Sequence, residues 1–289
     1  MKLPAWIELL RPQQWVKNSF VLAGLVFGHA WGDAQTLAAA LAATAAFCLV
    51  SGAVYAFNDS LDAPQDREHP DKRGRPVARG ALTPQQAQAL AAAAAVAGIA
   101  LASWAGWRVA LIAAGYLALI AAYTLGLKRV AVLDVFVIAA GFMLRLLAGT
   151  VGIGIAPSSW LLACGVLLTL FLGFAKRRAE IARLAGDAGN HRAVLADYGT
   201  DFLDKAITLC AAGMVASYSL YTLAEETARV HGTGLLVLTL PWVLLGTLRY
   251  LYRLHFRGGG GDPAEELVRD PVLGSAVLGW TATVLWLIA

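Results

Sequence analysis

Long apolar stretches, separated by short polar segments, constrain this chain more than any other feature. A helix as long as any of these stretches can cross a hydrocarbon core of about 30 Å at 1.5 Å per residue, the shorter ones with little tilt. The sequence therefore predicts an all-α, polytopic integral membrane protein. Its nine expected transmembrane helices lie at about 15–31, 36–57, 84–105, 108–127, 131–153, 158–175, 203–224, 234–252 and 272–288.

Composition supports this class and argues against a soluble, nucleic-acid-binding protein. Of the 289 residues, 58% are hydrophobic and only 15% are charged, too few to cover a soluble surface. The net charge is +4, but the basic residues gather at helix ends, where membrane orientation explains them. No nucleic-acid partner is expected. The three cysteines lie in apolar stretches without metal-ligand spacing.

Lysine and arginine are distributed unequally between the two membrane faces. With nine helices, all of the 23 except Arg108, Arg145 and Arg229 fall on one side, which the positive-inside rule makes cytoplasmic. The expected location is the inner (plasma) membrane, crossed many times, with a cytoplasmic N-terminus. We expect a single transmembrane domain, residues 1–289, with active-site loops at about 58–83 and 176–202.

The end of the second predicted helix carries a group of oxygen ligands, in the sequence NDSLDAPQD. Asn58, Asp62 and Asp66 are spaced i, i+4 and i+8, which places them on one helical face, and Asp59 lies beside them. Such groups beside a membrane are costly unless a cation neutralises them. A sparse set of hard oxygen ligands suits Mg²⁺, which takes its other ligands from water and phosphate. A solvated helix end paired with nearby basic residues is the alternative.

The same stretch resembles the first acidic motif, NDxxDxxxD, of the UbiA superfamily of intramembrane prenyltransferases. The nine helices and the second polar loop after the sixth also resemble that family. The superfamily usually carries a second DxxxD motif after helix six, where this chain has AKRRAEI. Asp197 and Asp201 form a DxxxD only further along the chain.

Several stretches instead resemble an unusual phosphoribosyltransferase branch of the superfamily: LRPQQWVKN, LGLKRVAVLDV, MLRLLAG and AKRRAEI. The resemblance implies transfer of 5-phosphoribose from 5-phosphoribosyl diphosphate to a polyprenyl (decaprenyl-type) phosphate. The product would be a lipid-linked phosphoribose, a precursor of lipid-linked arabinose in cell wall biosynthesis. The implied cofactor is Mg²⁺. Three anionic phosphate groups also call for more basic residues than a prenyl diphosphate does.

These considerations give a set of candidate site residues. We expect Asn58, Asp62 and Asp66 to bind Mg²⁺, and Asp59, Asp62 and Asp66 to be the catalytic residues. Asp59 would act as a further ligand or hold a ligand in place. The candidates for substrate binding are Lys17, Asn18, Tyr55, Glu68, Lys72, Arg73, Arg75, Lys128, Asp134, Arg145, Lys176, Arg177, Glu180 and Tyr198.

Arg145 is the most unusual of these candidates, because it lies well inside an apolar segment. Arginine there costs at least about 2.5 kcal/mol on insertion scales. Asp134 is three turns away on the same face, too far for a direct contact. We therefore expect an anion or another helix to satisfy Arg145.

Two other functions remain open at this point. The first is an ordinary aromatic prenyltransferase of quinone or haem biosynthesis, which Asp197 and Asp201 would support. The second is a transporter, because charged residues at membrane depth also mark ion paths. The sequence shows no pair of broken helices and no inverted halves, so it offers little support for transport. Chain length of the lipid and oligomeric state are not encoded in any recognisable motif.

Overall fold

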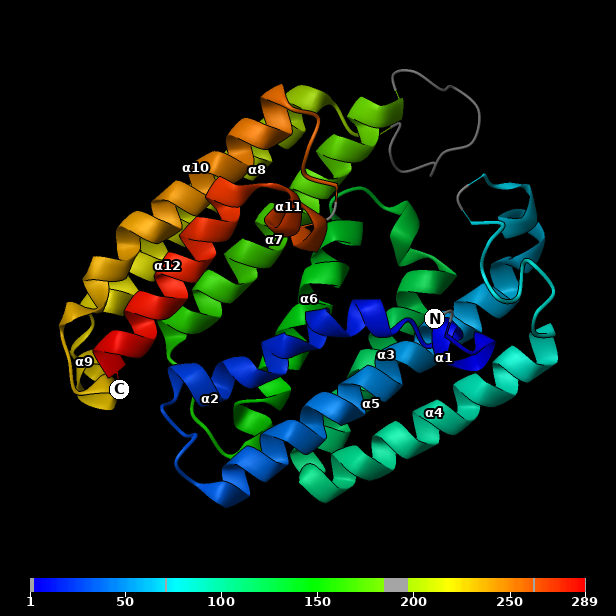
Figure 1. Cartoon of the computed structure of the whole chain (residues 1–289), viewed down its shortest axis with the longest axis horizontal. Helices are drawn as coiled ribbons and strands as arrows, with labels where there is room; N and C mark the ends of the chain where they lie inside the picture. Colours follow the sequence, from blue (N-terminus) through cyan, green and yellow to red (C-terminus); the bar gives the residue numbers. More distant parts are fainter. Residues whose placement is uncertain (1–2, 71, 185–196, 262, 289) are drawn as a thin grey trace. The chain divides into compact units, whose positions relative to one another are not determined.

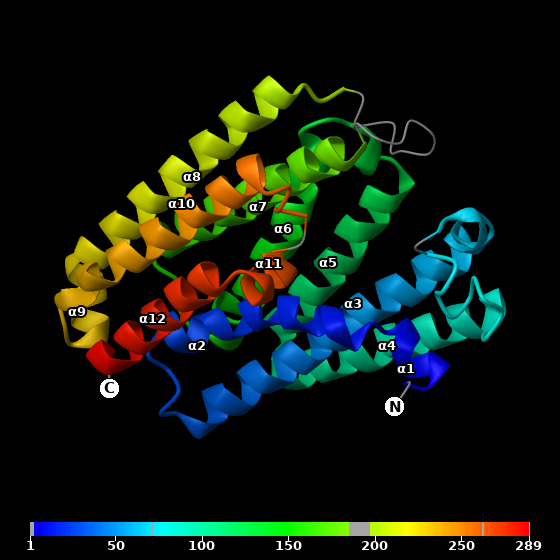
Figure 2. The ribbon, with the colours of Figure 1, turned by 45° about the horizontal axis from the view of Figure 1, so that its top comes forward.

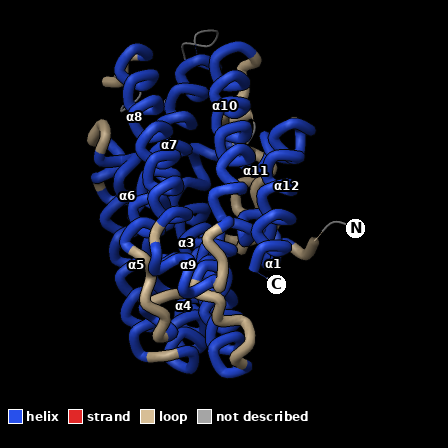
Figure 3. Tube along the Cα trace, turned by 90° about the vertical axis from the view of Figure 1, so that its left-hand side faces the viewer, coloured by secondary structure: helices blue, strands red, loops and turns tan. Residues whose placement is uncertain are grey.

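The computed structural model describes residues 3–70, 72–184, 197–261 and 263–288, and within these ranges all regular structure is helical (Figure 3). This confirms the predicted all-α class. The described chain forms two compact units. The first comprises Met1–Ala121 with Leu144–Pro157, and the second comprises Ala122–Met143 with Ser158–Ala289.

The first unit is built mainly on one long helix. This helix, α3 (Ala34–Glu68), begins at Asp33, whose carboxylate accepts the backbone N–H of Thr36 at 2.7 Å. That hydrogen bond caps the helix. The Thr36 hydroxyl, which donates to the same carboxylate oxygen, and then this N–H lower the pKa of Asp33. The unit also contains α1 (Ala5–Leu9), the 3₁₀ helix η1 (Pro12–Leu22), α2 (Ala23–Phe27), α4 (Pro84–Ala105), most of α5 (Trp107–Leu125), the end of α6 (Leu133–Ala148) and η3 (Val151–Ile153).

Helices α3 and α4 lie side by side along most of their length (Figure 1). Their contact is made by small residues: a side chain on Gly98 would come within 3.1 Å of the Ala46 carbonyl oxygen. Alanine and glycine allow helix backbones to approach closely in a membrane, where packing rather than hydrophobicity drives association. The alanine-rich sequence of these helices therefore suits this interface.

A second close approach joins η1 and α2 to the end of α6. A side chain on Gly149 would overlap the carbonyl oxygen of Val21, and one on Gly24 would overlap the carbonyl of Gly149. Glycine is required at both positions because backbone meets backbone there.

The second unit contains the start of α6 and the helices that follow. They are α7 (Ser159–Leu184), α8 (Thr200–Leu223), α9 (Glu225–His231), η5 (Leu235–Thr239), α10 (Leu240–Phe256), α11 (Pro263–Arg269) and α12 (Pro271–Ile288). Helices α7 and α8 lie side by side in both views (Figures 1 and 2). Their core contains Phe171, Phe174, Leu203 and Ile207.

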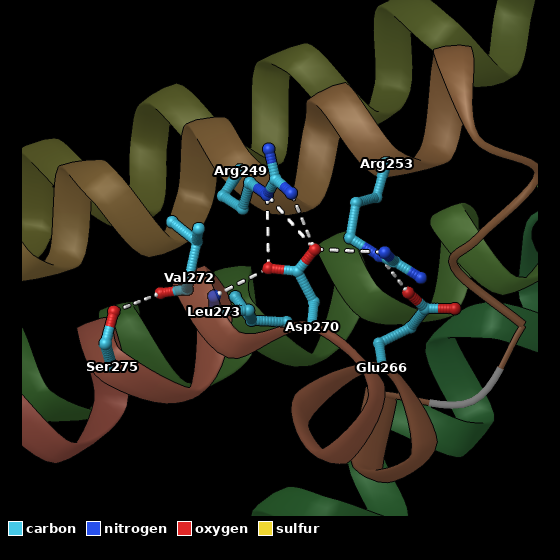
Figure 4. A network of polar contacts seen from close by, with 7 residues as sticks. All are labelled: Arg249, Arg253, Glu266, Asp270, Val272, Leu273 and Ser275. Carbon is cyan, nitrogen blue, oxygen red and sulfur yellow. Dashed lines mark hydrogen bonds and ion pairs between the residues drawn. The ribbon is translucent and has the colours of Figure 1, made fainter.

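A network of ion pairs fastens α11 and the start of α12 to α10 (Figure 4). The carboxylate of Asp270 accepts from Arg249 Nη2 at 2.8 Å and from Arg253 Nη1 at 3.0 Å. It also accepts the backbone N–H of Leu273, so it caps α12. Arg253 Nε donates a hydrogen bond to Glu266 Oε2 at 2.6 Å. Hydrogen bonds from Arg249 lower the pKa of Asp270 well below its usual range.

Eight helical spans in the described chain are long and apolar enough to cross a membrane, so the integral membrane class is supported. The predicted segment at 15–31 is not among them, because it forms η1 and α2 instead of one long α-helix. The count of nine therefore stays a prediction. A 3₁₀ helix rises about 2.0 Å per residue, more than an α-helix, so a short segment in this conformation still reaches far.

Candidate functional site

The acidic motif lies in the last three turns of α3, so residues 58–68 are helical where the sequence suggested a loop. Asp59 and Asp66 are buried, whereas Asp62 is exposed and Asn58 is partly exposed. Seven residues make almost two full turns, so Asp59 and Asp66 share the inward face. Asn58, Asp62 and Asp66 still follow one another at helical spacing along α3, and Asp59 lies on its buried side.

Three basic side chains surround the two buried carboxylates. Arg75 Nη1 lies 2.6 Å from Asp66 Oδ2 and 3.2 Å from Asp59 Oδ1, so it bridges them. Arg11 Nη2 donates to Asp59 Oδ1 at 2.5 Å. Lys72 Nζ lies 4.0 Å from Asp66 Oδ1. The cluster therefore already combines carboxylates of α3 with cations from two other segments of the first unit.

Arg11 is a site residue that the sequence analysis missed. Its backbone is left-handed, with φ of 52°, and it lies between α1 and Pro12 of η1. Its guanidinium lies 4.8 Å from the centre of the Tyr55 ring, a cation–π contact. Arg11 is 48 residues from Asp59 along the chain, and no spacing rule links them.

The segment after α3 is tied down by two further arginines. Arg67 Nε donates to the carbonyl of Ala78 at 3.2 Å, and Arg79 Nη2 pairs with Glu8 at 2.7 Å. The pair with Glu8 raises the pKa of Arg79. These contacts hold the turn that carries Lys72 and Arg75 against the end of α3.

The residues of this cluster fit a divalent metal by chemical type. Asp59 Oδ2 is buried and has no hydrogen-bond partner among the described residues. Asn58 and Asp62 make no side-chain hydrogen bond within the described chain. Amide and carboxylate oxygens are the ligands that Mg²⁺ prefers. No group of three or more His, Cys, Asp or Glu side chains converges on one point in the described ranges, so the metal site stays a prediction.

Glu68 and Arg73 are exposed near this cluster and make no ion pair within the part of the chain that the structure describes. Tyr55 is half-buried beneath Arg11, as the cation–π contact requires. The role of these three side chains in substrate binding stays a prediction.

Arg145 is buried in the first unit. Of the two expected partners, an anion or another helix, the structure shows neighbouring helical segments accepting its hydrogen bonds. Its Nε donates to Asn18 Oδ1 at 2.7 Å, and its Nη2 donates to Tyr116 Oη at 3.0 Å. The Tyr116 ring also lies 4.6 Å from the guanidinium carbon. The 3₁₀ conformation of η1 helps, because it places Asn18 and Val21 on one buried face at i and i+3. Lys17 is half-buried on the same helix.

The second unit contains a buried ion pair between α6 and α7. Arg177 Nε lies 2.7 Å from Asp134 Oδ2, and the two side chains are 1% and 0% exposed. Arg177 Nη1 also pairs with Glu180 at 2.6 Å. Tyr198 Oη donates to Asp134 Oδ1 at 2.6 Å. Burial, followed by this hydrogen bond, raises the pKa of Tyr198, so the hydroxyl stays protonated.

The structure thus brings together four of the candidates for substrate binding: Asp134, Arg177, Glu180 and Tyr198. Lys176, one residue before Arg177, is exposed instead. It has no ion pair with another described residue. Much of the predicted loop at 176–202 lies outside the described residues, and its first nine residues belong to α7.

Asp197 and Asp201, the alternative second acidic motif, are both exposed. Asp201 pairs with Lys205 one turn further along α8, at 2.7 Å, and its side chain is 81% exposed. Such a solvated pair contributes little stability and leaves the carboxylate outside the buried cluster.

The chain is similar to known proteins over most of its length. Residues 18–258 match the model of the UbiA prenyltransferase family. The decaprenyl-phosphate phosphoribosyltransferase of Mycolicibacterium smegmatis is 32% identical over 288 residues, covering 96% of this chain and 90% of the relative. The protein of that name from Mycobacterium tuberculosis strain H37Rv is 34% identical, covering 96% and 92%.

A solved structure shares the fold. It is a UbiA homologue from Archaeoglobus fulgidus bound to GPP and Mg²⁺, with a TM-score of 0.71 and 17% identity. The match covers 98% of this chain and 99% of that one.

Proposed function

Because this chain belongs to the UbiA prenyltransferase family, we propose that it is a transferase that moves 5-phosphoribose from 5-phosphoribosyl diphosphate to a polyprenyl phosphate. Relatives named decaprenyl-phosphate phosphoribosyltransferase, which match nearly the whole chain, support this choice of substrates. The observation that carries the proposal is the cluster of Asp59 and Asp66 with Arg11, Lys72 and Arg75. Carboxylates beside several cations suit a metal-bound diphosphate.

The acidic residues of α3 would hold the metal. Asp59 Oδ2 lacks a hydrogen bond within the described chain, and Asn58 and Asp62 are accessible, so these residues with Asp66 are the proposed ligands. Bound Mg²⁺ would neutralise charge on the diphosphate. The nearby Arg11, which the sequence analysis did not include, joins the proposed site.

The basic residues would bind and orient the anionic substrates. We assign phosphate contacts to Lys72, Arg73, Arg75, Lys128 and Lys176, and ribose contacts to Glu68. Arg145 donates to Asn18 in the first unit, and Lys17 precedes Asn18 on η1. We assign these three residues to the lipid phosphate. An arginine in an apolar surrounding attracts an anion strongly.

The reaction follows from these charges. An oxygen of the lipid phosphate forms a bond to ribose C1 from one face, while the bond from C1 to the diphosphate oxygen breaks on the other. Both electrons of the broken bond leave with the diphosphate, and the centre inverts. The attacking oxygen is already anionic, so no general base is needed. Basic side chains stabilise the negative charge that develops on the departing diphosphate, and positioning of the two substrates supplies the rest of the rate acceleration.

The distribution of basic residues supports an orientation with the N-terminus and the acidic motif on the cytoplasmic side of the plasma membrane. A soluble donor made in the cytoplasm would then reach the acidic motif without crossing the membrane.

One experiment tests the proposal. Purified protein is incubated with labelled 5-phosphoribosyl diphosphate, Mg²⁺ and a polyprenyl phosphate, and the lipid phase is then extracted. Label in the lipid phase is the expected result. A parallel incubation uses a labelled prenyl diphosphate and 4-hydroxybenzoate, because the family also contains aromatic prenyltransferases. Prenylated product in that reaction alone would contradict the proposal.

A further inference from the structure

The turn between α5 and α6 has an unusual backbone at Val132. Its φ is 68°, a left-handed value that a side chain branched at Cβ rarely adopts. The N–H of Leu133 bonds to the carbonyl of Ala131 at 2.8 Å, which closes a three-residue γ-turn around Val132. The form of this turn with positive φ is rare and strained. Something outside the turn must hold it.

Tyr198 makes the contact that holds it. Its hydroxyl accepts the backbone N–H of Val132 at 2.6 Å and donates its own proton to Asp134 Oδ1 at 2.6 Å. Asp134 is fixed in turn by Arg177 Nε at 2.7 Å. Tyr198 is 6% exposed and lies 66 residues further along the chain than Val132. One buried hydroxyl therefore links a strained turn to a buried ion pair.

The turn carries two basic residues on the short 3₁₀ helix η2 (Leu127–Arg129). Arg129 is exposed, whereas Lys128 is half-buried. Lys128 has no ion pair or hydrogen bond to another side chain in the described part of the chain. A half-buried ammonium group with no counter-ion among the described residues is suited to binding an anion.

We propose that Tyr198 is a positioning residue, whose hydroxyl holds the Val132 turn so that Lys128 is presented to a phosphate group of the substrate. Asp134 and Arg177 support it by fixing the hydroxyl. The three residues then act through Lys128 and do not touch the substrate themselves. The identity of the phosphate ligand rests on the proposed function, but the coupling between Tyr198 and the turn does not.

The coupling is tested without substrate. Hydrogen–deuterium exchange is followed in peptides covering residues 126–132 of the wild type and of Tyr198→Phe. Faster exchange in the variant is expected, because the N–H of Val132 loses its acceptor. The matched control is Tyr218→Phe, which removes another buried hydroxyl, bonded to Thr239 and Trp280. It should leave the turn unchanged. Unchanged exchange in Tyr198→Phe would overturn the inference.

The link to Lys128 is tested by a double-mutant cycle on binding of 5-phosphoribosyl diphosphate. Tyr198→Phe and Lys128→Ala should each weaken binding about 10- to 100-fold, the effect of losing one charge-assisted phosphate contact. The double variant should bind no more weakly than Lys128→Ala alone, because both act through one contact. Multiplied losses would show that Tyr198 meets the substrate directly, and would overturn the proposal.

A rescue variant gives an independent readout. Adding Val132→Gly to Tyr198→Phe should restore much of the binding, because glycine adopts positive φ without strain and needs no tether. Absence of rescue would contradict the role of the strained turn.

If the wild type binds geranyl diphosphate but not 5-phosphoribosyl diphosphate, the proposed function fails. The same variants, measured with geranyl diphosphate, then still decide the inference.

Discussion

Arg177 and Asp134 form an ion pair that is almost completely buried, with Nε and Oδ2 2.7 Å apart. Removing only one of the two charges would leave the other buried without a partner. This lowers the stability of the fold far more than removing both charges.

The first prediction concerns this pair. Arg177→Met should lower the free energy of unfolding by about 3–5 kcal/mol, because it strands the buried carboxylate of Asp134. Adding Asp134→Leu to Arg177→Met should recover most of that loss. Thermal unfolding in detergent measures both variants. A double variant no more stable than Arg177→Met would contradict the argument, as would a single variant as stable as the wild type.

The second prediction concerns the metal. Asp62 is exposed and makes no side-chain hydrogen bond in the described chain, so Asp62→Ala should leave thermal stability unchanged. It should nevertheless abolish turnover and weaken Mn²⁺ binding, measured by electron paramagnetic resonance. The matched control is Asp201→Ala, another exposed carboxylate on a helix, which should retain both. Full activity of the wild type in excess chelator would rule out the metal.

The third prediction separates the two enzyme classes. Lys176→Ala should weaken binding of 5-phosphoribosyl diphosphate by one to two decades, because a charge-assisted phosphate contact contributes about 1.5–3 kcal/mol. Asp197→Ala and Asp201→Ala should have little effect, because both carboxylates are exposed. An aromatic prenyltransferase with a second metal site there would show the reverse order. Isothermal titration of the three variants distinguishes these outcomes.

The fourth prediction concerns pH and the network in Figure 4. The pKa of Asp270 is lowered in the folded protein, so its ionised form stabilises the fold above the unfolded pKa of about 3.9. This contribution disappears as the pH falls through the lower, folded-state pKa. Asp270→Asn should therefore melt several degrees below the wild type at pH 7, and the difference should shrink steadily below pH ~4. A difference in melting temperature that is independent of pH would contradict this account.

The fifth prediction concerns orientation. In a variant without native cysteines, a cysteine replacing exposed Arg73 should react with an impermeant maleimide only from the cytoplasmic side. One replacing Gly232, which follows α9, should react only from the opposite side. Labelling of both from the same face would show that the predicted helix count is wrong.

The sequence predicted the helical class and the acidic motif because both depend on local patterns. Apolar stretches of membrane length and an i, i+4, i+8 spacing need no knowledge of neighbours. Spacing defines a helical face but not the direction in which that face points. For this reason the sequence could not show that Asp59 and Asp66 are buried while Asp62 is exposed.

The contacts of Arg11 and Tyr198 could not be predicted in the same way. Arg11 reaches Asp59 across 48 residues, and Tyr198 reaches Val132 across 66. A positive φ at Val132 could not be predicted either, because valine disfavours this conformation. The 3₁₀ conformation of η1 likewise depends on packing against α3 and α6, which buries Asn18 and Val21.

The crossing of η1 and α6 at Gly149 has a consequence for Arg145, which lies one turn earlier on α6. Because peptide atoms touch there, the spacing of the two segments depends on a single hydrogen atom at the glycine Cα. A methyl group at Gly149 would alter no charge, but it would push η1 away and draw Asn18 from the Arg145 guanidinium. Gly149 thus fixes how close Asn18 lies to Arg145, the buried charge of this region.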